Sequence, residues 1–280
     1  MARAGPVLRP VDSSSTLHSQ VPSSSDSRSH SDGRRFPPMI RTIAAVVFLA
    51  LAISLVLPWV ILWSIFANKP DFLYWTSVSG IRIANRILGF RVHREGLENI
   101  PPGVCIFVSN HASNMDPPVL IPAIPRRISI LTKKEVFRIP FLGTAMRRVK
   151  FISVNRANKE AAARSVDLAI QYLKEGVSFA VFAEGTRSPD GRLKKFKKGP
   201  FIMAIQSGVP IVPISLIGTQ NLMRKGDWTV QTGDVIVRFG PPVDPSPYLI
   251  AQRGELRDRI QALVAAGLPS EQRPLSSSNS

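Results

Sequence analysis

The feature that most constrains this sequence is a run of 24 residues, 43–66, without a single charged side chain. As an α-helix it would be about 36 Å long, more than the roughly 30 Å of a bilayer's hydrocarbon core. A helix buried in a soluble protein is shorter and is usually apolar along one stripe only. The long leading arm and the lack of a small-residue cleavage site argue against a signal peptide. The run therefore predicts a membrane segment.

The flanks of this run leave two arrangements open. Lys and Arg occur on both sides of it, so the positive-inside rule gives no orientation. Pro58 lies inside the run, and aromatic residues of the kind found at membrane interfaces cluster from Trp59 to Trp75. The segment is either one spanning helix or a Pro-kinked hairpin with residues 71–88 that enters the membrane and returns. In both cases we predict an anchor over residues 39–89, after a disordered Ser-rich arm at 1–38.

Composition restricts the chemistry and the partners. Cys105 is the only cysteine, which excludes a disulfide framework and a zinc site of several thiolates, and the four histidines are scattered. We therefore predict no metal and no cofactor. The formal charge is +17, and residues 126–156 and 184–199 hold nine and six Lys or Arg against one and two acids. Such focused charge indicates an anionic partner, and the lack of nucleic-acid motifs favours lipid or phosphate over nucleic acid.

From residue 90 on, short β-rich runs alternate with helical periodicity, a pattern typical of an α/β sheet covered by helices on both faces. We predict an α/β domain at 90–266 with a mixed, mostly parallel sheet, followed by a flexible tail at 267–280. The predicted strands are residues 104–109, 128–131, 150–154, 177–183, 211–217 and 235–239. The predicted helices are residues 140–149, 158–175, 200–206 and 255–265.

Polar residues follow three of these strands, beyond the carboxyl ends where α/β sheets bind their ligands. His111 and Asp116 come after the first strand, Arg156 after the third, and Glu184 with Arg187 after the fourth. His111 and Asp116 are five residues apart, about 140° around a helix, so a turn must separate them if they act together. A histidine oriented by a carboxylate is a general base. Asp116, which a proline follows, also fits a helix N-cap, and the spacing leaves both interpretations open.

Four sequence boxes in order resemble those of the PlsC-like glycerolipid acyltransferases, the lysophosphatidic acid (1-acylglycerol-3-phosphate) acyltransferases. NHASNMD at 110–116 resembles the NHxSxxD box, and KKEVFRIPFLG with FISVNR resembles the second box and its lead-in. FAEGTRS resembles the third box and VPIVPIS the fourth. The resemblance covers roughly residues 89–242. One departure is Asn155, where relatives often carry an acidic residue, and we expect a minor effect. Serine hydrolases are disfavoured because the sequence has no GxSxG elbow.

The resemblance implies a reaction and roles for named residues. The protein would transfer a fatty acyl group from acyl-CoA or acyl-carrier protein to the sn-2 hydroxyl of 1-acylglycerol 3-phosphate, giving phosphatidic acid for phospholipid synthesis. His111 would be the base and Asp116 its orienting acid. The oxyanion that develops in such a reaction needs N–H donors, and the candidates are backbone groups near residues 112–113 or the short helix after Asp116. The resemblance assigns the acceptor's phosphate to Arg156, Glu184, Gly185, Thr186 and Arg187. The anion site could extend to Lys194, Lys195, Lys197 and Lys198, but for most of these lysines we favour contacts with lipid headgroups, because exposed lysines bind anionic surfaces. The resemblance assigns the acyl-donor region to Pro210 and Pro213, although prolines at the entry of an edge strand are an equally good explanation of these two residues.

Two alternatives stay open at this point. The acceptor could be a lyso-ornithine lipid or glycerol 3-phosphate, because the boxes separate such acceptors poorly. More remotely, the chain could be a non-catalytic, membrane-tethered basic module that recruits acidic partners. A membrane-borne acceptor and a soluble thioester have to meet at the bilayer surface. We therefore expect a protein of the cell membrane whose catalytic domain faces the cytoplasm.

Overall fold

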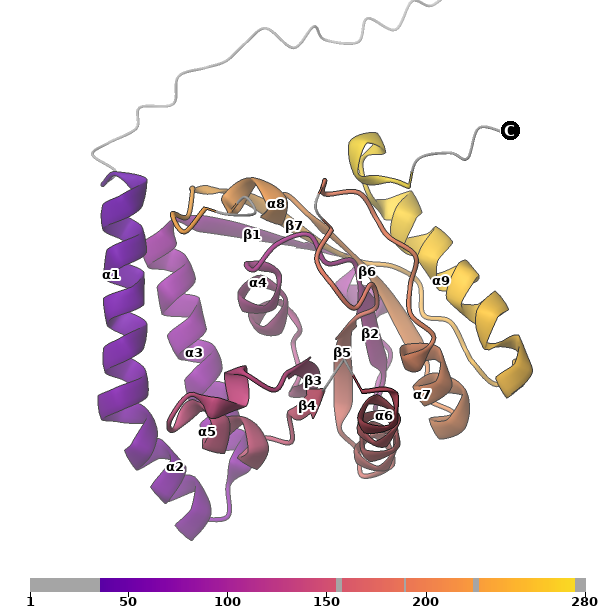
Figure 1. Cartoon of the computed structure of the whole chain (residues 1–280), viewed down its shortest axis with the longest axis horizontal. Helices are drawn as coiled ribbons and strands as arrows, with labels where there is room; N and C mark the ends of the chain where they lie inside the picture. The colour runs from indigo at the N-terminus through magenta and orange to yellow at the C-terminus, as the bar shows by residue number, and fades with distance from the viewer. Residues whose placement is uncertain (1–35, 155–157, 189, 224–226, 275–280) are drawn as a thin grey trace, which may run out of the picture. The chain divides into compact units, whose positions relative to one another are not determined.

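The computed structural model describes residues 36–154, 158–188, 190–223 and 227–274. These residues form an α/β domain with a seven-stranded sheet, preceded by long apolar helices (Figure 1). The predicted fold class, a mixed and mostly parallel sheet covered by helices, is confirmed. The predicted Ser-rich arm lies, up to residue 35, outside the described residues, and so does Arg156.

All six predicted strands are present, with ends shifted by a few residues, and all four predicted helices form. The strands are β1 (Phe90–Glu95), β2 (Ile106–Ser109), β3 (Ile128–Lys133), β4 (Ile152–Val154), β5 (Ser178–Phe182), β6 (Ile211–Ile217) and β7 (Gly233–Phe239). The α-helices are α1 (Pro38–Leu51), α2 (Leu57–Phe66), α3 (Pro70–Leu88), α4 (Asp116–Ala123), α5 (Leu142–Arg148), α6 (Lys159–Lys174), α7 (Gly199–Ser207), α8 (Thr219–Leu222) and α9 (Arg253–Gly267).

The strand order is β1-β7-β6-β2-β5-β3-β4. The five strands from β6 to β4 run parallel, whereas β7 pairs antiparallel with β6 and parallel with β1. Strand β1 is not among the predicted strands, because Phe90–Glu95 has the sequence FRVHRE and only Phe90 is buried. Such a strand lies at the edge of the sheet, where charged side chains are tolerated.

Two apolar cores cover the two faces of the sheet. Along β6, Val212, Ile214 and Leu216 point into one core, which helices α3 and α4 complete. Ile211 points into the other, which α6, α7 and α9 complete. This alternation is the period of two that a strand imposes on its side chains. Helices α6, α7 and α9 lie together on the side of the sheet away from α1 and α3 (Figure 1).

The amino-terminal helices form a hairpin. Residues 38–66 are one continuous helix, long and apolar enough to cross a bilayer, with a π-helical turn at Ala52–Val56 between α1 and α2. There the amide of Leu57 bonds to the carbonyl of Ala52, five residues back, one residue before Pro58, which has no N–H to donate. The chain reverses at residues 67–69, and α3 packs back against α1 and α2. Residues 38–66 and α3 thus form a helical hairpin, and the long arm of this hairpin is also the helix of membrane-spanning length. Whether the long helix crosses the membrane or enters it and returns with α3 stays a prediction.

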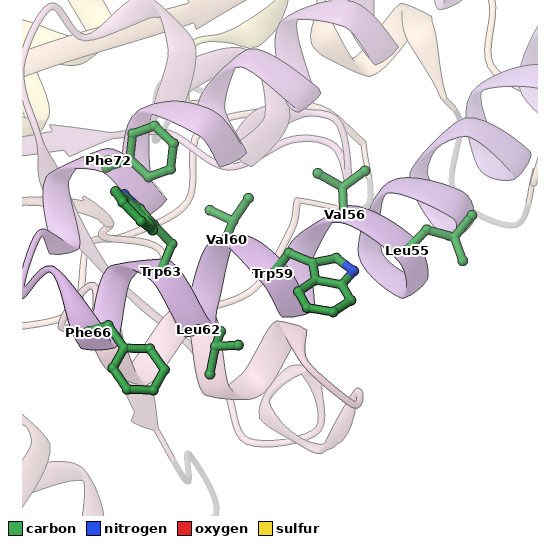
Figure 2. Close-up of a pocket in the computed structure, with 8 residues that line it drawn as sticks. All are labelled: Leu55, Val56, Trp59, Val60, Leu62, Trp63, Phe66 and Phe72. Atoms are coloured by element: carbon green, nitrogen blue, oxygen red, sulfur yellow. The ribbon is translucent and has the colours of Figure 1, made fainter.

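The outer surface of α2 is apolar and exposed. A groove of about 690 Å³ runs along it, lined by eight apolar side chains, two of them tryptophans. Figure 2 shows Trp59, Leu62 and Phe66 on one side of the helix, and all three side chains are exposed. A soluble protein rarely exposes so much contiguous apolar surface, so this face fits membrane association.

The carboxyl-terminal segment differs from the prediction. We expected a flexible tail from residue 267, but Leu268 and the side chain of Gln272 are buried. The carbonyl of Gln272 accepts a hydrogen bond from the amide of Leu193 (2.8 Å), and that of Arg273 accepts one from the Arg192 guanidinium (3.2 Å). The predicted boundary is therefore wrong, because residues 268–274 are bonded to the loop before α7.

Candidate active site

The carboxyl ends of β2 and β5 place the main candidate residues side by side. β2 and β5 are neighbours in the sheet, and their ends carry His111 and Glu184. β4, whose end precedes Arg156, lies two strands further from β2 than β5 does. The structure therefore brings the first and third sequence boxes together. The placement of Arg156 lies outside the described residues.

His111 and Asp116 form a hydrogen-bonded pair. The Nδ1 atom of His111 lies 2.7 Å from Oδ2 of Asp116, and the Asp116 side chain is fully buried, with 0% exposed. The same oxygen accepts the amides of Ala112 (2.7 Å) and Ser113 (2.9 Å), so the chain turns between the two residues as their spacing requires. With Nδ1–H donating to the carboxylate, Nε2 of His111 is the nitrogen that carries the free lone pair.

This geometry corrects two interpretations of the sequence. Asp116 is the first residue of α4, and its carboxylate bonds to the loop before the helix instead of capping the amides of the next turn. The N-cap interpretation is therefore wrong. The amides of Ala112 and Ser113 are both bonded to this carboxylate, so they are not the oxyanion donors that we expected.

The β5 loop holds the backbone of His111 from both sides. Its amide donates to Oε1 of Glu184 (2.8 Å), and its carbonyl accepts the amide of Ser188 (2.9 Å). The imidazole ring stacks on Phe182, with ring centroids 4.5 Å apart and planes inclined by 26°. These three contacts fix both the position of the residue and the plane of its ring.

The side chain of Glu184 is buried and bonds to main-chain amides of the protein. Its side chain is 2% exposed, and its second oxygen accepts the amide of Lys194 (3.2 Å). Burial raises the pKa of Glu184 to about 7, although the two N–H donors oppose the shift. A buried carboxylate with this role does not fit the predicted contact with the substrate's phosphate. Glu184 instead joins the His111 loop to the basic segment before α7.

That basic segment presents several cations. Nζ of Lys194 donates to Oγ1 of Thr186 (2.9 Å) and to the carbonyl of Arg187 (3.3 Å), so Thr186 positions a lysine. Arg187 is exposed, and Lys195, Lys197 and Lys198 are exposed as well. Gly185 has a φ of +74°, and a Cβ there would lie 3.2 Å from the stem of Lys197. Glycine is thus required for both the backbone conformation and the close approach of that lysine.

A cavity of about 690 Å³ opens beside this segment. Its polar rim includes Lys194, Lys195 and Lys197, but not Lys198. Its apolar walls come from β3, β4, β5, α6 and α7: Leu131, Val154, Ala162, Val166, Val181 and Met203. Phe182, against which His111 stacks, also lines it, so the cavity adjoins the histidine. Cations at the rim and hydrocarbon inside fit an amphiphilic anion.

Sequence reasoning missed Asn110, which holds the end of β2 against β6. Its side-chain amide donates to the carbonyl of Leu216 (2.9 Å) and accepts the amide of the same residue (2.8 Å). The side chain therefore takes the place of a backbone partner where the β2–β6 ladder ends. An asparagine at a strand end looks like an ordinary turn residue, so only the box NHASNMD could have drawn attention to it.

Pro210 and Pro213 lie away from the histidine. Pro213 pairs with Val108 of β2, three residues before His111, or roughly 10 Å along the strand, and Pro210 lies further back. Pro213 belongs to an interior strand, and it faces the break in the β6–β7 ladder at Gly240. A break of this kind admits a residue without an N–H. The structure brings neither proline to His111, and their part in donor binding stays a prediction.

Among the described residues, no group of three or more His, Cys, Asp or Glu side chains is placed to hold a metal ion. Cys105 is buried, which raises its pKa to about 11 and keeps it protonated. The chemistry that the site offers is thus a histidine base with a buried carboxylate behind it. The anionic-ligand cavity lies next to this pair.

An α/β fold with this site matches a known class of enzyme. Residues 91–217 match a family model described as "Acyltransferase", and they include the His111–Asp116 pair, the β5 loop and the residues that line the cavity. The protein is an acyltransferase.

Individual relatives narrow the class. The chain is 32% identical over 237 residues to the 1-acyl-sn-glycerol-3-phosphate acyltransferases of Limnanthes alba and Limnanthes douglasii, covering 84% of this chain and 83% of each relative. A 1-acyl-sn-glycerol-3-phosphate acyltransferase of Pseudomonas aeruginosa is 31% identical over 183 residues, covering 64% and 69%. The crystal structure of PlsC, the 1-acyl-sn-glycerophosphate (LPA) acyltransferase of Thermotoga maritima, matches with a TM-score of 0.73 at 31% identity, covering 82% of this chain and 94% of that one. The chain belongs to the PlsC-like 1-acyl-sn-glycerol-3-phosphate acyltransferase family.

Proposed function

We propose that this protein transfers a fatty acyl group from an acyl thioester to the sn-2 hydroxyl of 1-acylglycerol 3-phosphate, giving phosphatidic acid. The observation that carries the proposal is the His111–Asp116 pair, with 2.7 Å between Nδ1 and Oδ2 and the carboxylate fully buried. The names of the relatives support the choice of acceptor. The donor is acyl-CoA or acyl-carrier protein.

In this mechanism His111 moves one proton. Nε2 accepts the proton of the sn-2 hydroxyl as its oxygen attacks the thioester carbonyl, and Asp116 stabilises the imidazolium that forms. The C–S bond of the tetrahedral intermediate then breaks, and Nε2 returns the proton to the leaving thiolate. The products are the new ester and a free thiol. A base positioned in this way contributes roughly 10²–10⁴-fold to the rate.

The basic segment before α7 supplies the anion site. Arg187 is exposed and can offer a two-pronged fork to a phosphate, and Lys194 is already oriented by Thr186. The lysine-rimmed cavity fits the phosphate-bearing end of a substrate whose remainder is apolar. Glu184 contributes by holding the His111 loop against this segment.

The apolar hairpin α1–α3 places this chemistry at a bilayer. A lysophospholipid stays in the membrane, whereas the thioester donor comes from solution, so the two meet at the surface. We place the domain on the cytoplasmic side of the cell membrane, where the soluble donor is available. Protease digestion of sealed vesicles of known orientation would test this side.

His111→Ala should lower kcat for acyl transfer to 1-acylglycerol 3-phosphate by at least roughly 10²-fold, because the proton acceptor is gone. His93 provides a matched control, since it also bonds to an aspartate, Asp234 (2.9 Å), but on the exposed surface of β1 and β7. His93→Ala should leave kcat unchanged. Purified protein in mixed micelles, assayed with both donors, gives the comparison. Full activity of His111→Ala would exclude this mechanism.

Arg187→Ala should raise the KM for the acceptor roughly 10- to 100-fold, the effect of losing one charge-assisted hydrogen bond, with little change in the KM for the donor. Arg259 on α9, exposed and bonded to Tyr248, is the control arginine. The same assay run with glycerol 3-phosphate and a lyso-ornithine lipid decides between acceptors. An Arg187→Ala enzyme with unaltered acceptor KM would remove this residue from the phosphate site.

A further inference from the structure

A second apolar surface lies near the hairpin, on the loop between β3 and α5 (residues 134–141). Ile139 is 44% exposed and Phe141 46% exposed. Helix α5, which follows the loop, packs against α2, and its Arg148 donates to the carbonyl of Ser64 (2.9 Å) at the carboxyl end of that helix. There Phe66 is 80% exposed. The apolar surfaces of the β3–α5 loop and of α2 are far apart in the sequence, but they thus belong to elements that pack against each other.

The loop is built to hold these side chains outward. Phe141 has a φ of +60°, a conformation that a bulky residue adopts only under constraint. The amide of Gly143 bonds to the carbonyl of Ile139 (3.0 Å), and a Cβ on Gly143 would collide with the carbonyl oxygen of Phe137. The exposure of Ile139 and Phe141 is therefore a property of a constrained turn, and not of a frayed end.

Three cations precede the two apolar side chains in the sequence. Lys133, Lys134 and Arg138 are exposed, and no carboxylate of the described residues forms an ion pair with any of them. The loop carries one acid, Glu135. A second copy of the chain would present the same positive charge and would be repelled. An anionic lipid surface offers both hydrocarbon for the apolar tip and phosphate for the cations.

The position of the loop in the sheet supports this partner. β3 ends at Lys133 and runs parallel to β2 and β5, so the loop leaves the sheet at the carboxyl ends of the strands, where His111 and Glu184 also lie. Contact between the loop and a bilayer would bring this end of the sheet toward the lipids. A site with a membrane-borne substrate needs such an orientation, which the apolar hairpin alone does not set.

We propose that the β3–α5 loop is a second membrane-contacting element, which inserts Ile139 and Phe141 among the lipid headgroups and binds anionic headgroups through Lys133, Lys134 and Arg138. This inference rests on the membrane association of the hairpin and is independent of the acyl-transfer reaction. Contact of this loop with the bilayer would orient the domain relative to the membrane, in addition to the anchoring by the hairpin.

Single labelled cysteines in the full chain test the insertion. In a Cys105→Ala background, the Phe141→Cys variant is labelled at the new cysteine with an environment-sensitive fluorophore. The labelled protein is reconstituted into phosphatidylcholine vesicles that contain about 30 mole per cent of the anionic lipid phosphatidylglycerol. Leu62→Cys, on the exposed face of α2, is the positive control, and Ala262→Cys, exposed on α9, is the negative control. We expect spin-labelled lipids to quench the labels at 141 and 62 but not at 262.

Two outcomes would contradict the membrane contact of the loop without contradicting the anchoring by the hairpin. Quenching at 62 with iodide access at 141 equal to that at 262 would overturn the proposal while leaving the hairpin in the membrane. Protection of 141 from iodide without quenching by lipid would indicate a protein contact and would also overturn it. Neither outcome bears on the acyl-transfer mechanism, because no activity is measured.

Charge removal tests the headgroup contacts. The triple variant Lys133→Gln, Lys134→Gln, Arg138→Gln should reduce insertion of the label at 141 into vesicles with anionic lipid. Each cation near the surface strengthens binding about fivefold, so the loss of three lowers the partitioning of the loop by up to about 100-fold. In vesicles of phosphatidylcholine alone the variant and the parent should not differ. Equal quenching of the two proteins on anionic vesicles would exclude the cations from the contact.

Discussion

Glu184→Gln isolates the effect of a buried carboxyl group whose pKa is raised. In the folded protein this side chain is 2% exposed, and burial raises its pKa from the ordinary 4.5 to about 7. Glutamine keeps the shape and cannot ionise, but its single oxygen can accept only one of the two amides, of His111 and Lys194, that bond to the two oxygens of Glu184. Because the loss of that hydrogen bond does not depend on pH, the pH dependence of the difference between the two proteins reports the ionisation of Glu184.

The raised pKa makes stability depend on pH in a defined direction. Between about pH 4.5 and 7 the unfolded chain releases the Glu184 proton and the folded protein keeps it, so unfolding releases a proton and the free energy of unfolding falls as pH rises. The rise in the pKa of Glu184 from 4.5 to about 7 corresponds to about 3 kcal/mol in total, of which about 2.5 kcal/mol falls between pH 5 and 8. For a domain of this size that is roughly 5–10 °C in Tm.

Thermal unfolding in detergent micelles at pH 5, 6, 7 and 8 measures this difference. Glu184→Gln should lack the wild-type decline, so its Tm rises relative to wild type as pH increases. Asp190→Asn is the matched control: Asp190 is exposed in the same segment, and the hydroxyl of Ser188 and then the amide of Arg192 lower its pKa. Asp190 is therefore ionised across this range in both states.

A constant Tm difference between Glu184→Gln and wild type from pH 5 to 8 would refute the reasoning. It would mean that the Glu184 carboxyl titrates alike in the folded and unfolded chains, despite its burial. A decline that Asp190→Asn also abolishes would refute it as well, because the pH dependence would then not belong to Glu184.

Substitutions at Asn110 and at Gly143, the second with Gly254 as its control, test contacts of the main chain. Asn110→Ala removes both hydrogen bonds to Leu216 and should lower the free energy of unfolding by about 2–3 kcal/mol, seen as a lower Tm with a less active enzyme. Gly143→Ala forces a Cβ against the carbonyl of Phe137 and should lower the free energy of unfolding by about 1–3 kcal/mol. Gly254→Ala, where a Cβ meets open space, should leave that free energy unchanged or raise it slightly. Equal effects of the two substitutions on Tm would contradict the packing argument.

Much of the fold could be predicted because the spacing of apolar residues in the sequence reflects which side chains are buried. The strands that are buried on both faces, such as Ile106–Ser109 and Ser178–Phe182, read as continuous apolar runs and were found. The predicted helix at 158–175 begins where the structure has it, because the side chain of Asn158 accepts the amide of Ala161 (2.8 Å) as an N-cap. Strand β1 was missed because one buried residue in six leaves no apolar pattern.

The site was only partly predictable from the sequence. His111 and Asp116 were identified as a pair through the family boxes, since their spacing alone equally fitted an N-cap. The inward role of Glu184 could not be predicted, because a glutamate in a basic loop looks like a surface residue until the neighbouring strand is in place. The bonds of Gln272 and Arg273 to the segment before α7 depend on contacts across about 80 residues, which no local pattern records.

The two hydrogen bonds of the His111 main chain, to the side chain of Glu184 and from the amide of Ser188, also bear on how this enzyme could be redesigned. The segment that we propose to hold the acceptor is the same one that aims the base. Grafting a relative's whole segment, to accept another headgroup, would shift the imidazole along with the new contacts. A successful exchange keeps Glu184 and the amide of Ser188 in register with residue 111 and varies the stretch beyond them.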